Sequence, residues 1–210
     1  MIGVSVHDGL RGRAAKLAAA AAALKRRSGV EAAPFSLAFL TDRRRIASPE
    51  PILRALPTGA AVIYRDYDDP KRAAVAARYA AICRRRGVFF LVGADASLAD
   101  AISADGLHLP ARALMTAAPR RRPGLLTASC HNADELAHAA RAGADLALLS
   151  PAFTTLSHPY TKNIGPARFI SLATTATLPI LALGGVNETS AHRLRGPNVV
   201  GLAAISAFVG

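Results

Sequence analysis

The chain has 210 residues, 51% of them hydrophobic and 5% aromatic, and its formal net charge at pH 7 is +12. This length and apolar content suffice for one buried core, and no apolar run reaches the roughly 18 residues that a membrane-spanning helix needs. Two cysteines exclude a disulfide framework, and the scarcity of aromatic residues beside the basic runs disfavours specific nucleic-acid binding, so we expect a cytoplasmic protein.

The first predicted element is a helix over the alanine-rich segment 12–29, because alanine has the highest helix propensity. We assign residues 1–33 to an N-terminal helical extension and residues 34–210 to one further domain. That domain contains short apolar runs without alternation, which are typical of parallel strands covered on both faces. The predicted strands are 35–41, 60–65, 88–93, 106–109, 125–129, 145–150, 179–184 and 199–204.

Helical segments separate these strands. Segment 70–87 begins with a proline and ends at Gly87, and segment 132–143 begins with a capping box of Asn132 and Glu135. Eight strands alternating with helices predict a single (β/α)8 barrel of the α/β class, with an open doubly wound sheet as the alternative. Basic runs such as 84–86 then lie at helix ends, although a general attraction for polyanions stays open.

Little sequence follows the eighth strand, so we expect the last outer helix to be missing or very short. An uncovered apolar strand face is unfavourable, and we expect the N-terminal helix to cover it. The alternative is a helix that pairs with a second subunit.

Barrels of this kind place their sites in the loops after the strands. Gly184-Gly185 follows the seventh strand, and Ile205-Ser206 follows the eighth. Backbone amides in these two loops predict a phosphate site, because glycine lets an anion approach the chain closely. The alternative for the glycine pair is a tight turn ahead of a helix capped by Asn187.

The segment after the sixth strand is long and polar, reading LLSPAFTTLSHPYTKNIG over 148–165. Its Thr155 and Ser157 offer hydroxyl donors, while His158 and Lys162 bring positive charge to an anionic ligand. Long loops in compact domains are usually functional, so we predict ligand contact there. A solvated loop with turns at its prolines is the alternative.

Three stretches, 143–165, 178–187 and 199–208, resemble in this order the C-terminal half of the thiamine phosphate synthase family, which includes the thiazole tautomerases. The resemblance implies a (β/α)8 barrel that acts in thiamine biosynthesis. Synthases of this family join hydroxymethylpyrimidine diphosphate to thiazole phosphate with Mg²⁺. The tautomerases convert a thiazole phosphate carboxylate into its aromatic isomer.

The resemblance also implies roles for single residues. Thr155 and Ser157 match hydroxyl residues of the substrate loop, and His158 stands where many members have lysine. The residues that match the thiazole phosphate site are Gly184, Gly185, Ile205 and Ser206. Ser129 matches a serine near the diphosphate. His131 lies where the tautomerases have an acid/base histidine; its alternative is a residue at the entry of a helix, and His108 is interpreted as a strand histidine that faces a neighbour.

The N-terminal half departs from the synthase pattern. Of a Gln-x-Arg-x-Lys motif only Arg65 survives, Gly93-Ala94 replaces an Asn-Asp pair that binds Mg²⁺, and Pro110-Ala111-Arg112 replaces the second metal carboxylate. Asp95 and Asp66 are the candidate replacements as metal ligands. Without those carboxylates a diphosphate leaving group is poorly neutralised.

The sequence therefore favours a divergent or tautomerase-like enzyme that binds a phosphorylated thiazole and needs no cofactor. Two alternatives stay open: a synthase with relocated Mg²⁺ ligands, and a non-catalytic protein that binds a phosphorylated ligand. We expect no membrane partner, and a homodimer remains open.

Overall fold

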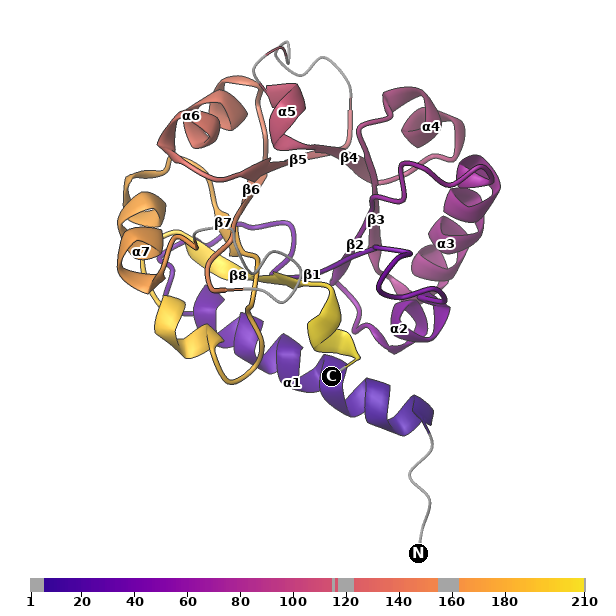
Figure 1. The fold of residues 1–210 in the computed structure, drawn as a ribbon, viewed down its shortest axis with the longest axis horizontal. Helices are drawn as coiled ribbons and strands as arrows, with labels where there is room; N and C mark the ends of the chain where they lie inside the picture. Colours follow the sequence, from indigo (N-terminus) through magenta and orange to yellow (C-terminus); the bar gives the residue numbers. More distant parts are fainter. Residues whose placement is uncertain (1–5, 115, 117–122, 155–162, 210) are drawn as a thin grey trace, which may run out of the picture.

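The computed structural model describes residues 6–114, 116, 123–154 and 163–209. Its eight strands are all parallel and form a closed barrel in chain order, with β1 paired to β8 (Figure 1). The strands are β1 (Leu37–Leu40), β2 (Ala61–Tyr64), β3 (Phe89–Gly93), β4 (Gly106–Leu109), β5 (Leu125–Cys130), β6 (Leu146–Leu149), β7 (Ile180–Ala182) and β8 (Val199–Ala204). The barrel prediction is confirmed, and the open sheet is excluded.

Helices surround this ring of strands (Figure 1). The α-helices are α1 (Val6–Lys25), α2 (Glu50–Ala55), α3 (Arg72–Arg86), α4 (Ala96–Ala101), α5 (Ala111–Leu114), α6 (Ala133–Arg141) and α7 (Pro166–Thr175), and the 3₁₀ helices are η1 (Ala191–Leu194) and η2 (Ser206–Phe208). Gly87 ends α3 with φ of 63°, and the Asn132 side chain caps α6 by accepting the Glu135 N–H. Both predicted helix signals are confirmed. No helix among the described residues is long and apolar enough to cross a membrane.

The N-terminal helix α1 takes the place of an outer helix after β8. Only η2 follows β8 in the described part of the chain, and α1 packs along β8 and against η1 (Figure 1). Its buried face consists of Ala14, Leu17, Ala21 and Leu24, which belong to the main core. The prediction that α1 covers the exposed strand face is therefore confirmed. The helix predicted after Asn187 is replaced by η1, and the Asn187 side chain accepts the N–H groups of Thr189 and Ser190.

The strand register decides which side chains face the barrel axis. Gly93 pairs with His108, which pairs with Thr127 on β5, and residues paired across parallel strands share a face. On β2, Tyr64 lies outside and packs against Tyr79 of α3, so the next residue, Arg65, turns inward. A polar layer thus forms inside the barrel at the carboxyl ends of β2 to β5.

Candidate functional site

A buried histidine holds the centre of this polar layer. His108 is fully buried, and its Nδ1 and Nε2 each lie 2.9 Å from a hydroxyl oxygen, of Thr127 and Ser129 respectively. Burial, and secondarily the charge of Arg65, lowers the pKa of His108 to about 3. The ring is therefore neutral near pH 7 and faces its neighbour strand, as predicted. Both ring nitrogens are engaged, so neither is free for a metal ion.

Arg65 brings the positive charge into this layer. Its backbone N–H donates to Thr41 Oγ1 over 2.9 Å, but its buried Nε has no hydrogen-bond partner among the described residues. Burial lowers the pKa of Arg65, and Tyr67 and Asp42 act against this effect. Arg65 directly follows β2, at the carboxyl end of that strand, and its role in ligand binding stays a prediction.

Tyr67 fills the space beside Arg65, and the sequence gives no sign of this role. Its ring contacts two guanidinium groups, with Arg72 Cζ 5.2 Å and Arg112 Cζ 5.3 Å from the ring centroid. A side chain at Gly93 would stand 2.9 Å from Tyr67 Oη and from Tyr64 O. The glycine that ends β3 therefore makes room for Tyr67, a link that only the three-dimensional structure reveals.

The two candidate metal ligands are already engaged. Asp66 Oδ1 accepts the Arg43 N–H at 2.8 Å, and Asp95 Oδ1 caps α4 by accepting the Leu98 N–H at 2.9 Å. The other Asp95 oxygen lies 3.9 Å from Arg72 Nε. Within the described ranges no three His, Cys, Asp or Glu residues come together as a metal site. The donor set at this corner does not fit Mg²⁺, which prefers several oxygen ligands.

His131 and Glu135 form a pair at the end of β5. Glu135 Oε2 lies 2.8 Å from His131 Nδ1 and also accepts the His131 backbone N–H at 2.7 Å. Glu135 Oε1 accepts from the Asn132 side chain, so the carboxylate is fixed by the same capping box that starts α6. The His131 side chain is 48% exposed, which leaves Nε2 accessible. The four-residue spacing of His131 and Glu135 is visible in the sequence. From the sequence alone, however, Glu135 is interpreted only as part of the helix cap.

The loops after β6 and β7 pack directly on one another. Ala152 N–H donates to Leu183 O and Phe153 N–H to Gly184 O, which extends the pairing of the two strands. Gly184 and Gly185 have φ of 89° and 66°, and a Cβ on Gly185 would lie 2.7 Å from Thr154 O. The glycine pair is therefore required by this close approach as well as by the turn.

The amides predicted to bind phosphate are available. Gly185 is exposed at the end of β7, Ser206 is exposed at the start of η2, and β7 and β8 are neighbours in the barrel. Neither residue's N–H donates to a backbone oxygen elsewhere in the described chain. Ile205, between Ala204 and Ser206, is buried. The predicted residues Thr155, Ser157, His158 and Lys162 lie outside the described residues.

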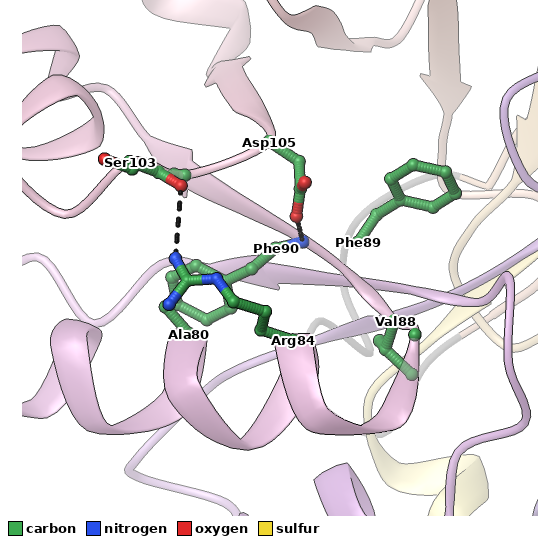
Figure 2. Close-up of a pocket in the computed structure, with 9 residues that line it drawn as sticks. Ala80, Arg84, Val88, Phe89, Phe90, Ser103 and Asp105 are labelled. Carbon is green, nitrogen blue, oxygen red and sulfur yellow. Dashed lines mark hydrogen bonds between the residues drawn. The ribbon is translucent and has the colours of Figure 1, made fainter.

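A cavity of about 230 Å³ lies at the other end of the barrel, where β3 and β4 begin. Its charged groups already have partners: Arg84 reaches Ser103 O and Asp105 Oδ2 accepts the Phe90 N–H (Figure 2). This end of the barrel contributes to stability rather than to chemistry. The site therefore lies at the mouth formed by the carboxyl ends of the strands.

Comparisons with known proteins agree with this geometry. A family model described as thiamine monophosphate synthase matches residues 37–208. The chain is 34% identical over 158 residues to a thiamine-phosphate synthase of Thiobacillus denitrificans, covering 71% of this chain and 74% of that protein. It is also 34% identical over 145 residues to a thiamine biosynthesis bifunctional protein of Symbiobacterium thermophilum, covering 67% of this chain and 30% of that longer protein.

A solved structure shows the same fold. Thiamine phosphate pyrophosphorylase from Pyrococcus furiosus superposes with a TM-score of 0.65 at 22% identity, covering 88% of each chain. The matching family model spans β1 to η2 and thus includes every strand of the barrel. The chain belongs to the thiamine monophosphate synthase family.

Proposed function

We propose that this chain is an enzyme of thiamine biosynthesis that binds thiazole phosphate and isomerises its ring, as the thiazole tautomerases do. The observation that carries the proposal is the His131–Glu135 pair, with Nδ1 and Oε2 2.8 Å apart at the rim of the mouth. A histidine oriented by a carboxylate is suited to general acid/base chemistry near neutral pH.

The pair assigns different tasks to the two ring nitrogens of His131. Nδ1–H donates to the Glu135 carboxylate, so the neutral ring presents the lone pair of Nε2 to the ligand. Nε2 takes a proton from a ring carbon of the thiazole, and the electrons of the broken C–H bond enter the ring. The resulting imidazolium, stabilised by Glu135, returns the proton at the position that yields the aromatic isomer.

The phosphate of the ligand belongs in the loops after β7 and β8. The N–H groups of Gly185 and Ser206 donate to no backbone oxygen among the described residues and can therefore bind an oxyanion, and the Gly184-Gly185 turn keeps side chains away from it. The β6 loop rests on the same turn, so Thr154 lies beside any ligand held there.

A second candidate function is that of a synthase, which joins hydroxymethylpyrimidine diphosphate to thiazole phosphate. The similarity to a thiamine-phosphate synthase favours it, whereas the engaged carboxylates of Asp66 and Asp95 oppose it. A third candidate, a non-catalytic protein that binds a phosphorylated ligand, would keep the amide loops and need no His131 chemistry.

The test is the rate of thiazole phosphate carboxylate isomerisation in the wild-type protein and in His131→Asn. We expect the variant to lose about 10²-fold or more in kcat, as is typical when a general acid/base is removed. His192→Asn is the matched control, because His192 is exposed on η1 and its Nδ1 donates only to Thr189 O. An unchanged kcat in His131→Asn would support the non-catalytic candidate instead.

A further inference from the structure

In the loops at the barrel mouth, the guanidinium group of Arg65 differs from its charged neighbours because its buried Nε has no hydrogen-bond partner among the described residues. Three arginines in the loop after β1 are ion-paired: Arg43 with Asp69, Arg44 with Asp68 and Arg45 with Asp42. Arg65, in the neighbouring loop after β2, has no ion pair or side-chain hydrogen bond within the described ranges. Its positive charge is therefore available to a ligand.

Arg72 does not share this task. Its Nη1 donates to Asp66 O over 3.1 Å, its Nη2 donates to Gly93 O over 2.7 Å, and its Nε faces Asp95. The group therefore fastens the ends of β2 and β3 together. Arg112 is exposed and stacks on the Tyr67 ring, at the outer edge of the mouth.

We propose that Arg65 forms a carboxylate-binding subsite on the β2–β4 side of the mouth, which accepts the carboxylate of the thiazole phosphate carboxylate. This inference rests on the proposed function and names the group that selects the substrate. A ligand with a phosphate at one end and a carboxylate at the other matches a mouth with amides on the β7–β8 side and a free guanidinium on the β2–β4 side.

The amount of charge favours a carboxylate over a diphosphate. One free guanidinium balances one negative charge, whereas a diphosphate carries about three and needs a metal ion beside it. The carboxylates at this corner, Asp66 and Asp95, are engaged with backbone N–H groups and provide no metal site. A planar carboxylate also matches the fork of a guanidinium in a bidentate pair, which would satisfy the unpartnered Nε.

The surroundings of Arg65 strengthen such a pair. On the inner side its neighbour is the neutral ring of His108, which is bonded to the hydroxyls of Thr127 and Ser129, while the carboxylates of Asp42 and Asp66 partly offset its charge from the loops. Arg65 Nε itself is shielded from water. An ion pair formed in such a desolvated place is stronger than one at the surface.

The experiment compares two ligands, thiazole phosphate with and without the carboxylate, by calorimetric titration of wild-type protein and Arg65→Gln. We expect the wild-type Kd to be about tenfold or more lower for the carboxylate form, the usual size of a charged hydrogen-bonded pair. Arg65→Gln should bind both ligands equally, with the Kd of the carboxylate-free form within about twofold of wild type. Arg44→Gln is the control, because the Arg44 side chain is 83% exposed and is already paired with Asp68.

Arg65→Lys is a second variant in case Arg65→Gln fails to fold, because it keeps the positive charge and removes only the planar fork. We expect Arg65→Lys to keep part of the preference for the carboxylate ligand. A preference that persists in Arg65→Gln, or an equal loss of affinity for both ligands, would overturn the subsite. If the protein isomerises the thiazole but Arg65→Gln keeps the preference for the carboxylate ligand, only the subsite is contradicted. If the preference depends on Arg65 but no isomerisation occurs, only the proposed function is contradicted. Failure of both ligands to bind the wild-type protein would contradict both.

Discussion

Two histidines on adjacent strands illustrate how position decides the chemistry of one side chain. His108 on β4 is fully buried between hydroxyl groups, while His131, just beyond β5, is half exposed and bonded to a carboxylate. The first is locked in its neutral form and orders the polar layer below the mouth. The second has a free Nε2 and a charge partner, which is the arrangement that proton transfer requires.

The burial of His108 predicts a pH-dependent stability. In the unfolded chain this histidine has its ordinary pKa of 6.5 and takes up a proton as the pH falls below that value. Burial lowers its pKa in the folded protein to about 3. Between these values the unfolded state binds more protons, so the free energy of unfolding falls as the pH is lowered, by up to about 1.4 kcal/mol per pH unit. Above pH 6.5 this contribution is complete and constant.

Urea unfolding at a series of pH values between 7 and about 4.5 measures this slope. His108→Gln should flatten the profile over that range, because glutamine does not titrate. His192→Gln, which changes an exposed histidine, should keep the wild-type slope. Parallel profiles for wild type and His108→Gln would show that His108 is not the residue responsible.

At the scale of elements, the strands were predictable because each is a continuous apolar run. Helix α6 was predictable because its capping box is local in the sequence. The contacts of Arg65, His108 and Ser129 were not predictable, because they depend on the register between strands that are far apart in the chain. Tyr67 escapes sequence reasoning for the same cause, since its place is created by the absence of a side chain at Gly93.

The packing of α1 on β8 predicts a large effect of one buried leucine. Leu17 is fully buried in the main core, so Leu17→Ala removes contacts and leaves a cavity between α1 and the barrel. We expect the free energy of unfolding to fall by about 2–5 kcal/mol. Ala19→Ser on the exposed face of the same helix is the control.

Urea unfolding monitored by circular dichroism measures both variants. If α1 instead packed on a second subunit, the loss of stability in Leu17→Ala would depend on protein concentration. An effect that is large and independent of concentration would place the helix on its own barrel. A loss below about 0.5 kcal/mol would contradict the packing.

At the scale of the whole molecule, closure of the barrel brings eight strand ends to one rim. The rim then carries the two groups of the proposed anion recognition: backbone amides after β7 and β8, and the Arg65 guanidinium after β2. The His131–Glu135 pair lies at the end of β5, and β5 stands between β2 and β7 in the strand order of the barrel. The β7–β8 loops were predictable from glycine and serine in the sequence, whereas the availability of Arg65 follows from ion pairs that only the fold defines.

This division of charge predicts that Mg²⁺ leaves ligand binding unchanged. Asp66 and Asp95 each hold a backbone N–H group with one carboxylate oxygen, and a divalent ion would have to approach the positive charges of Arg65 and Arg72. Calorimetric titration of thiazole phosphate carboxylate should therefore give Kd values within about twofold in EDTA and in excess Mg²⁺. A synthase with relocated ligands requires the opposite, namely that incubation with hydroxymethylpyrimidine diphosphate and thiazole phosphate yields thiamine phosphate and pyrophosphate only when Mg²⁺ is present. Such metal-dependent product would establish the second candidate function. It would mean that Mg²⁺ neutralises the diphosphate charge, which Arg65 alone cannot balance.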